Sequence, residues 1–215
     1  MVENAQGLIL RTRPLTETSL IVHWLTPDFG RIATVAKGAR RSNSPFRGKL
    51  DLFYLADLSF ARSRRSELHT LREVLLRETH TVLREELSCL RQASYCAALI
   101  EVATETDTPL PAIFELMTRL LAHLSSQPPQ PLTILAFEIK LLSELGLGPD
   151  LAETKLSAGA RQVLERIAEM DWPFIGCLQS SPLRSHERQH FLQDFLVRHL
   201  GRLPKGRDAA LAGPQ

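Results

Sequence analysis

The chain of 215 residues is poor in cysteine and has no long apolar run. Its three cysteines, Cys89, Cys96 and Cys177, never form a C-x-x-C pair, so we expect neither a disulfide framework nor a cysteine zinc knuckle. No apolar run approaches the roughly 20 residues of a membrane span, so no contact with a membrane is expected. The N-terminus lacks the basic and apolar regions of a signal peptide, which indicates a cytoplasmic protein.

Several motifs of common enzymes are missing as well. The phosphate loop G-x-x-x-x-G-K-[ST] is absent, so nucleotide hydrolysis is not expected. The chain has neither the G-x-G-x-x-G fingerprint of dinucleotide-binding folds nor the G-x-S-x-G elbow of serine hydrolases. We therefore predict that the protein has no bound cofactor.

Positive charge is concentrated in the front of the chain. Residues 1–80 contain 13 lysines and arginines against 8 aspartates and glutamates, whereas residues 81–215 contain 13 against 16. The net charge of +2 therefore combines a basic front with a mildly acidic remainder. This asymmetry points to a polyanion as the partner of the front part.

The front part has the two-residue period of β-strands. Apolar and polar residues alternate in short runs, and Pro27-Asp28-Phe29-Gly30 is a turn by composition. Five strands with a long loop after the third favour a small closed barrel of the oligonucleotide-binding (OB) type, although the pattern alone does not separate it from other small barrels. The predicted strands cover residues 7–13, 18–26, 31–37, 49–60 and 68–76.

From Val82 onward the apolar spacing changes to three and four residues, the period of helices. Ser157 is a predicted N-cap, and residues 202–215 are expected to form a frayed tail. We therefore predict the α+β class, with a five-stranded OB-fold barrel domain over residues 1–78 and an all-helical domain over residues 79–215. The predicted helices cover residues 82–108, 113–124, 132–142, 157–170 and 182–200.

Ten basic residues of the front part fall on predicted strand faces and on two loops. Such side chains bind phosphates with little base preference, and each neutralised phosphate steepens the salt dependence. Phe29, Phe46 and Phe53 are candidate rings for base stacking, whereas Trp24, Tyr54 and Phe60 are expected inside the barrel. The alternative is that the arginines are simply solvated. The predicted nucleic-acid-binding residues are Arg11, Arg13, Lys37, Arg40, Arg41, Arg47, Lys49, Arg62, Arg64 and Arg65, with Arg40, Arg41, Arg64 and Arg65 foremost.

A second pattern, His186-Glu187-Arg188-Gln189-His190, matches the H-E-x-x-H of zinc hydrolases, in which two histidines bind zinc and the glutamate activates water. On a helix, both histidines lie far from the neighbouring apolar stripe, so they should face away from the core. The extended form of the motif fails at Gln193 and Leu196, and no glutamate follows as a third ligand. A zinc hydrolase is therefore an alternative interpretation, which a zinc determination would test.

Three stretches of the front part closely resemble one bacterial family. They are Gly7 to Leu20, Phe29-Gly30-Arg31, and Val35-Ala36-Lys37-Gly38-Ala39-Arg40-Arg41. Near the end, His199 to Arg202 with Lys205 and Arg207 is similar to that family's closing basic motif. On these residues the chain resembles the RecO family of DNA repair proteins, most specifically over residues 7–80.

The resemblance implies a recombination mediator that is not an enzyme. Members of that family bind single- and double-stranded DNA and anneal complementary strands. With RecR they help to load the recombinase RecA onto strands coated with single-strand-binding protein (SSB), whose acidic C-terminal tail docks on the helical half. The implied pathway is DNA recombination and repair after DNA damage, and the implied location is the cytoplasm, in association with the nucleoid.

The chain departs from the family at one place. Many members carry a four-cysteine zinc module after the third helix of the helical domain, where this chain has a short link, residues 146–156, without cysteine. The resemblance therefore predicts a member without zinc or any other metal, and contacts made through that module are not expected. A further alternative is a protein-interaction scaffold, which predicts negligible DNA affinity even at low salt.

Overall fold

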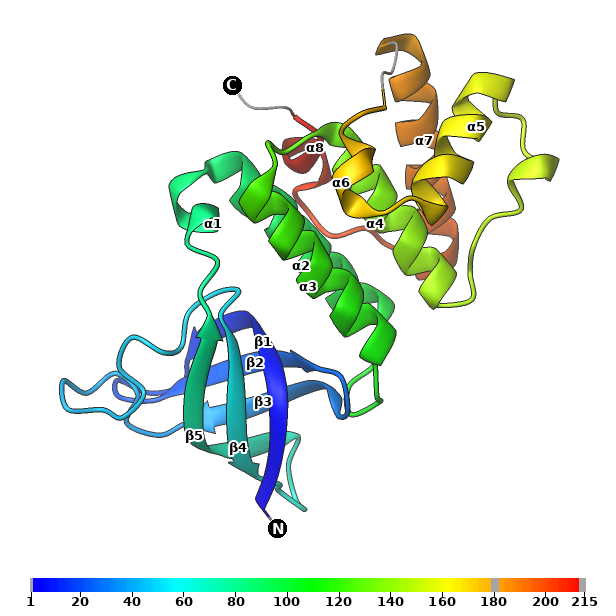
Figure 1. The fold of residues 1–215 in the computed structure, drawn as a ribbon. Helices are drawn as coiled ribbons and strands as arrows, with labels where there is room; N and C mark the ends of the chain where they lie inside the picture. The colour runs from blue at the N-terminus through cyan, green and yellow to red at the C-terminus, as the bar shows by residue number, and fades with distance from the viewer. Residues whose placement is uncertain (1, 179–181, 213–215) are drawn as a thin grey trace. The chain divides into compact units, whose positions relative to one another are not determined.

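A computed structural model defines residues 2–178 and 182–212 of the protein. The chain forms two compact units: residues 1–80 with 104–115, and residues 81–103 with 116–215. Strands come first and helices follow, so the predicted α+β class is confirmed (Figure 1). Among the described residues, no helix is both long enough and apolar enough to span a bilayer.

The strands of the first unit close into a barrel in the order β1-β2-β3-β5-β4. The β3–β5 pair is parallel, and the other neighbouring pairs are antiparallel. A five-stranded barrel with a long connection after β3 is the OB fold, which confirms the prediction. The strands are β1 (Val2–Pro14), β2 (Leu20–Thr26), β3 (Gly30–Ala36), β4 (Leu55–Ala61) and β5 (Leu68–Glu78).

Strand β1 is longer than predicted because it serves two partners. Its first half pairs with β4, beginning at Val2↔Ala61, and its second half pairs with β2, ending at Pro14↔Leu20. The register with β2 shifts after Ile9, which marks a bulge. A bulge bends a strand, and the bend allows β1 to pass from one neighbour to the other and close the barrel.

Strand β4 begins at Leu55 rather than at residue 49 as predicted. Residues 51–54 include turns, and Phe53 has a φ of +60° that ends any regular strand there. The segment still packs on β1, because the Phe53 amide donates to the Ile9 carbonyl (2.8 Å) and the Ile9 amide donates to the Tyr54 carbonyl (3.0 Å). Its apolar alternation therefore reflects a loop that covers the end of the barrel.

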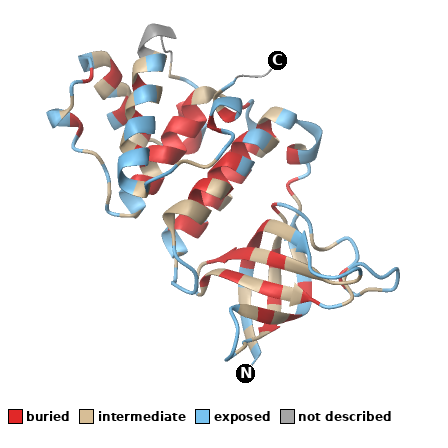
Figure 2. Ribbon diagram, turned by 180° about the vertical axis from the view of Figure 1, so that it is seen from behind, coloured by how far each residue is buried: buried red, intermediate tan, exposed pale blue. Residues whose placement is uncertain are grey.

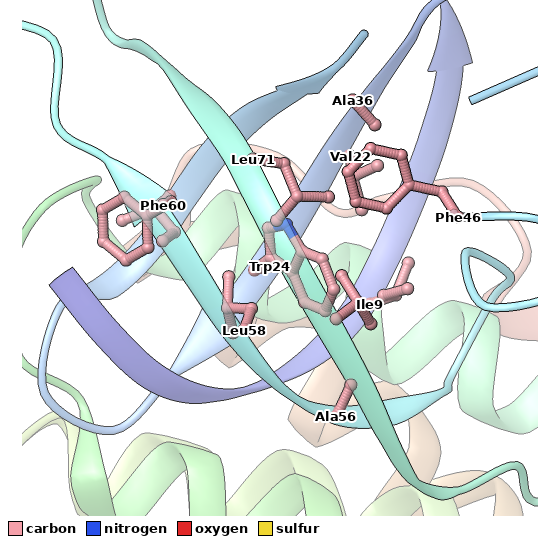
Figure 3. Close-up of a cluster of buried hydrophobic side chains, with 11 residues drawn as sticks. Ile9, Val22, Trp24, Ala36, Phe46, Ala56, Leu58, Phe60 and Leu71 are labelled. Atoms are coloured by element: carbon pink, nitrogen blue, oxygen red, sulfur yellow. The ribbon is translucent and has the colours of Figure 1, made fainter. Parts of the chain in front are cut away.

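Alternate strand positions fill the barrel interior. Burial alternates along β3 and β4, as the banding of the strands in Figure 2 shows. Trp24 is fully buried, and its indole N–H donates to the Thr34 hydroxyl (2.9 Å), so burying the ring leaves its polar group satisfied. The core cluster in Figure 3 consists of Ile9, Val22, Trp24, Ile32, Ala36, Phe46, Ala56, Leu58, Phe60, Leu71 and Val74.

Residues 104–110, which we call the strap, belong to the barrel unit although they lie far along the chain. The strap's Asp107 amide donates to the Arg31 carbonyl (3.1 Å), and its Leu110 amide donates to the Pro27 carbonyl (3.0 Å). These bonds tie the strap to the turn between β2 and β3 and to the start of β3. The prediction of a helix up to residue 108 is wrong at this point, because α2 ends at Ala103 and residues 104–108 are part of the strap.

Helix α4 forms the centre of the second unit. All residues from 132 to 139 are buried, and α4 packs against α2, α5, α6, α7 and α8. A helix buried on all sides has little amphipathic pattern, as its near-continuous apolar sequence reflects. The helices are α1 (Val82–Glu85), α2 (Leu87–Ala103), α3 (Pro111–Ser126), α4 (Pro131–Glu144), the 3₁₀ turn η1 (Leu151–Glu153), α5 (Ala158–Glu169), α6 (Trp172–Ile175), α7 (Pro182–Leu200) and α8 (Arg207–Leu211).

The predicted frayed tail is wrong for its described part. Residues 207–211 form α8, and Arg207 is only 6% exposed. Its guanidinium donates from Nε to Glu138 Oε1 (2.7 Å) and from Nη2 to Glu138 Oε2 (2.8 Å). The Tyr95 hydroxyl donates to the same Oε1 (2.6 Å). This buried network anchors the tail in the helical unit; residues 213–215 lie outside the described residues.

Candidate nucleic-acid interface

Arg11 and Arg13 lie on the outer face of the barrel. Their partners on β2 alternate with Val22 and Trp24, which point into the core, so the two arginines point outward. Arg13 is exposed, whereas Arg11 is half-buried. The outer surface of β1 and β2 therefore carries positive charge near the end at which β1 stops.

Four of the ten predicted cations, Lys37, Arg40, Arg41 and Arg47, are exposed in the loop between β3 and β4. The loop is held against the turn between β1 and β2: the Arg40 amide donates to the Thr18 carbonyl (2.9 Å). Backbone bonds thus fix the start of the loop while its basic side chains stay at the surface.

Three of these arginines surround one hollow. Arg40, Arg41 and Arg47 line a depression of about 370 Å³ that Phe46 and Leu50 also line. A guanidinium offers a fixed fork of donors that matches two oxygens of one phosphate, and several forks around one hollow favour a polyphosphate chain. The loop thus brings three of the predicted site residues together around one hollow.

Lys49 does not join this group. It is half-buried and lines a separate hollow of about 850 Å³, together with Asp57, Arg72 and Glu73. Acidic and basic side chains are mixed there, so that hollow is a poorer place for a phosphate than the arginine-lined one.

Arg62, Arg64 and Arg65 lie in the turn between β4 and β5, and all three are exposed. The parallel pair Ala33↔Leu68 places the residues before Leu68 beside the first residues of β3. This turn is therefore at the opposite end of β3 from Lys37. At about 3.3 Å per residue, the length of β3 separates the two basic ends by about 20 Å.

The predicted stacking platforms are not available in this structure. Phe46 is 7% exposed and belongs to the barrel core cluster, and Phe53 is only 1% exposed. Phe29 is half-buried and packs edge-on against Phe60, with ring centroids 5.4 Å apart. Trp24 and Phe60 are inside the barrel as predicted, whereas Tyr54 is half-buried and packs against the core cluster. The candidate interface is thus one of charge without exposed aromatic rings from this set.

The stretch Phe29-Gly30-Arg31 has a structural role that the sequence did not indicate. Gly30 has a φ of +61°, and a Cβ there would lie 1.7 Å from the Thr108 carbonyl oxygen of the strap. Arg31 Nε donates to the Thr104 hydroxyl (2.8 Å), and its guanidinium also bonds the Thr104 carbonyl. Glycine is needed for this close approach, and the arginine holds the strap in place.

The H-E-x-x-H segment is on α7, with the rings of His186 and His190 exposed and 6.3 Å apart. The Glu187 carboxylate accepts hydrogen bonds from the Ser157 amide (2.6 Å) and hydroxyl (2.7 Å), and Ser157 caps the start of α5. Within the described ranges, no three histidine, cysteine, aspartate or glutamate side chains come together in a way that could hold a metal. Glu187 therefore acts as a structural link between two helices.

The short link between α4 and α5 contains no thiol. Leu151 and Leu156 are buried, and the Asp150 carboxylate accepts from the Ala152 amide (3.0 Å) to cap η1. Packing and capping organise this link, and its residues do not fit a cysteine-bound zinc ion.

A third hollow, of about 380 Å³, lies in the helical unit beside α6. Arg119, His123, Trp172 and Phe174 are among the residues that line it, and Phe174 is 59% exposed. Arg119 lies 3.4 Å from Asp171 in an exposed ion pair. An apolar surface with a nearby arginine is the kind of groove that an acidic peptide with apolar side chains can enter.

Comparison with known proteins gives matches over most of the chain. The family described as "Recombination protein O N terminal" matches residues 1–80, and "Recombination protein O C terminal" matches residues 84–155. Three similar proteins, each named DNA repair protein RecO, come from Bacillus pumilus (32% identity over 151 residues), Bacillus subtilis (30% over 151) and Symbiobacterium thermophilum (36% over 154).

These matches cover 69–70% of this chain but only 58% of each of the three relatives. The two family matches lie on the barrel and on the helices that follow it, up to the link at residues 146–156. On this agreement of fold and sequence, the chain belongs to the RecO family.

Proposed function

We propose that the protein is a DNA repair and recombination mediator that binds single- and double-stranded DNA through its barrel. The observation that supports this most directly is the group of Arg40, Arg41 and Arg47 around one hollow, on an OB barrel of the RecO family. In this proposal residues 1–78 are the DNA-binding domain and residues 79–215 the helical domain. The DNA-binding residues are Arg11, Arg13, Lys37, Arg40, Arg41, Arg47, Lys49, Arg62, Arg64 and Arg65.

The charges would hold the phosphate backbone rather than the bases. Phosphate contacts carry no direct sequence information, so both single and double strands can bind. Because Phe46 and Phe53 are buried, they offer no platform to the bases, and the bases of a bound strand stay free to pair. Charge neutralisation on this surface would then let two complementary strands approach and anneal.

The helical domain would supply the protein contacts. Members of the family are expected to act with RecR and to help load RecA onto SSB-coated strands. The hollow beside α6 suits the acidic, apolar-ended SSB tail, because Arg119 is at its edge and Phe174 is exposed. The isolated tail peptide should compete with full-length SSB for the protein, and Phe174→Ser should weaken that competition. Failure of the peptide to compete would rule out docking of the SSB tail at this hollow.

The proposed action needs no catalytic residue, cofactor or metal. The protein would work in the cytoplasm on nucleoid DNA. A hydrolase that uses His186, Glu187 and His190 is disfavoured, because Glu187 is engaged by Ser157. About one zinc per purified chain would revive that alternative, and negligible DNA affinity at low salt would favour a protein-interaction scaffold.

The proposed DNA-binding surface is tested by the double variant Arg40→Ala/Arg41→Ala. Loss of two phosphate contacts should weaken binding of unrelated oligonucleotides to a similar degree and flatten the slope of log affinity against log salt by up to about two units. The matched control is Arg91→Ala/Arg166→Ala, which removes two exposed arginines from the helical unit. Unchanged DNA affinity in the first variant, or an equal loss of affinity in both variants, would mean that the DNA-binding surface lies elsewhere.

A further inference from the structure

One of the predicted DNA-binding arginines is already engaged by a carboxylate. Arg62 Nη2 lies 3.3 Å from Asp107 Oδ1, and the same oxygen lies 3.7 Å from His69 Nε2. The side chains of Arg62 and Asp107 are 45% and 34% exposed. Both partners are therefore open to solvent and to a competing anion, while the ring of His69 is buried against Phe60.

The backbone holds Asp107 in this position. Asp107 is on the strap with a φ of +57°, a conformation that aspartate and asparagine tolerate better than most residues. Its amide donates to the Arg31 carbonyl (3.1 Å), and Arg31 in turn bonds Thr104 with its guanidinium. The carboxylate would thus remain beside the turn between β4 and β5 even if Arg62 moved away.

We propose that Asp107 withholds Arg62 from DNA and thereby limits how strongly the turn between β4 and β5 binds phosphate. This inference rests on the proposed DNA-binding function of the barrel. A phosphate that reaches Arg62 must displace the carboxylate, and it must also approach a fixed negative charge well within the screening length of about 8 Å at physiological salt. Arg64 and Arg65, which are exposed in the same turn, then carry the binding at this end.

The variant Asp107→Asn tests the proposal, because asparagine has the same shape and tolerates the left-handed backbone. It should bind a labelled single-stranded oligonucleotide about two- to fivefold more tightly at low salt. This change in affinity corresponds to the free energy of one exposed ion pair, which no longer has to be broken before Arg62 binds phosphate. The salt slope should steepen by up to about 0.7, as expected for one more phosphate contact on a single strand.

The matched control is Asp171→Asn. Asp171 lies 3.4 Å from Arg119 in an exposed ion pair, so this change also removes the carboxylate partner of an arginine and adds one unit of charge. The pair belongs to the helical unit, which carries none of the ten proposed DNA-binding residues. Asp171→Asn should leave the DNA affinity close to that of the unmodified protein.

A double-mutant cycle with Arg62→Ala shows whether the gain in DNA affinity depends on Arg62. The gain from Asp107→Asn should be largely lost when Arg62 is alanine. The proposal is overturned if Asp107→Asn binds DNA no more tightly than Asp171→Asn does, or if the full gain in affinity persists without Arg62. A lower thermal midpoint with no change in DNA affinity would also overturn it, because Asp107 would then only support the strap. If the unmodified chain binds no DNA at all, the proposed function itself fails.

Discussion

Replacement of Arg207 by methionine should strongly destabilise the helical unit. Methionine keeps most of the side chain's volume and removes its charge. Glu138 is fully buried, and Arg207 supplies two of the three hydrogen bonds described for its carboxylate. Breaking a buried ion pair on one side leaves an uncompensated charge, so we expect a loss of about 3–5 kcal/mol.

The protonation states support this expectation. Burial opposes the charge of Arg207, but the hydrogen bonds and charge of Glu138 outweigh it and raise the pKa of the guanidinium. Burial, followed by the nearby Glu138 charge, raises the pKa of the Tyr95 hydroxyl, which therefore remains a donor. In Arg207→Met, one phenol is left to stabilise a carboxylate that the guanidinium held in the native protein.

A second variant separates the charge from the packing of α8. In Glu138→Gln/Arg207→Met neither of the two positions carries a charge, and the glutamine carbonyl can still accept from Tyr95. We expect this double variant to recover most of the lost stability in urea unfolding followed by far-ultraviolet circular dichroism, whose helical signal comes mainly from this unit. A double variant as unstable as Arg207→Met would refute the electrostatic explanation.

Two further perturbations test the remaining structure. Gly30→Ala should lower barrel stability by at least about 2 kcal/mol, because alanine disfavours the positive φ and its Cβ would meet the Thr108 carbonyl; Trp24 fluorescence during urea unfolding measures this. Burial lowers the pKa of His80 and His123 below that of the unfolded chain. Below about pH 6.5 the unfolded chain therefore binds more protons than the folded protein does. The stability that the two neutral histidines contribute is fully present above that pH, and it is lost as the pH falls through their pKa values in the folded protein.

Each of these expectations has a clear negative result. An unchanged unfolding midpoint for Gly30→Ala would mean that the strap does not need the close approach. Equal urea midpoints at about pH 7.5 and about pH 5.5 would contradict the buried neutral histidines. His123→Phe should reduce the pH dependence, because the ring packs 5.7 Å from Trp172 in a site that prefers an uncharged group.

Local patterns predicted the elements of the fold well. Two-residue alternation identified all five strands, and three- to four-residue spacing identified most of the helical part, because one face of each element must be buried. The same logic failed at residues 49–54, where apolar side chains alternate in a loop that covers the barrel end. Burial alone does not distinguish a strand from such a loop.

Non-local contacts account for what the sequence did not predict. The tail is ordered because Arg207 meets Glu138, 69 positions earlier, and the barrel is completed by the strap at residues 104–110. The basic residues of the loop between β3 and β4 and those of the turn between β4 and β5 lie at opposite ends of β3 because β3 and β5 run parallel, a pairing that alternation cannot indicate. Phe46 and Phe53 were misassigned since aromatic residues in a loop look alike in sequence whether they cover a core or face solvent.

The central claim is that the barrel binds the DNA backbone by charge. It is tested most directly by fluorescence anisotropy of a labelled single-stranded oligonucleotide with the unmodified protein, repeated from low to physiological salt. We predict tight binding at low salt that weakens linearly in a plot of log affinity against log salt, with a similar slope for unrelated sequences. Absence of binding at low salt, or an affinity that does not change with salt, would contradict the claim.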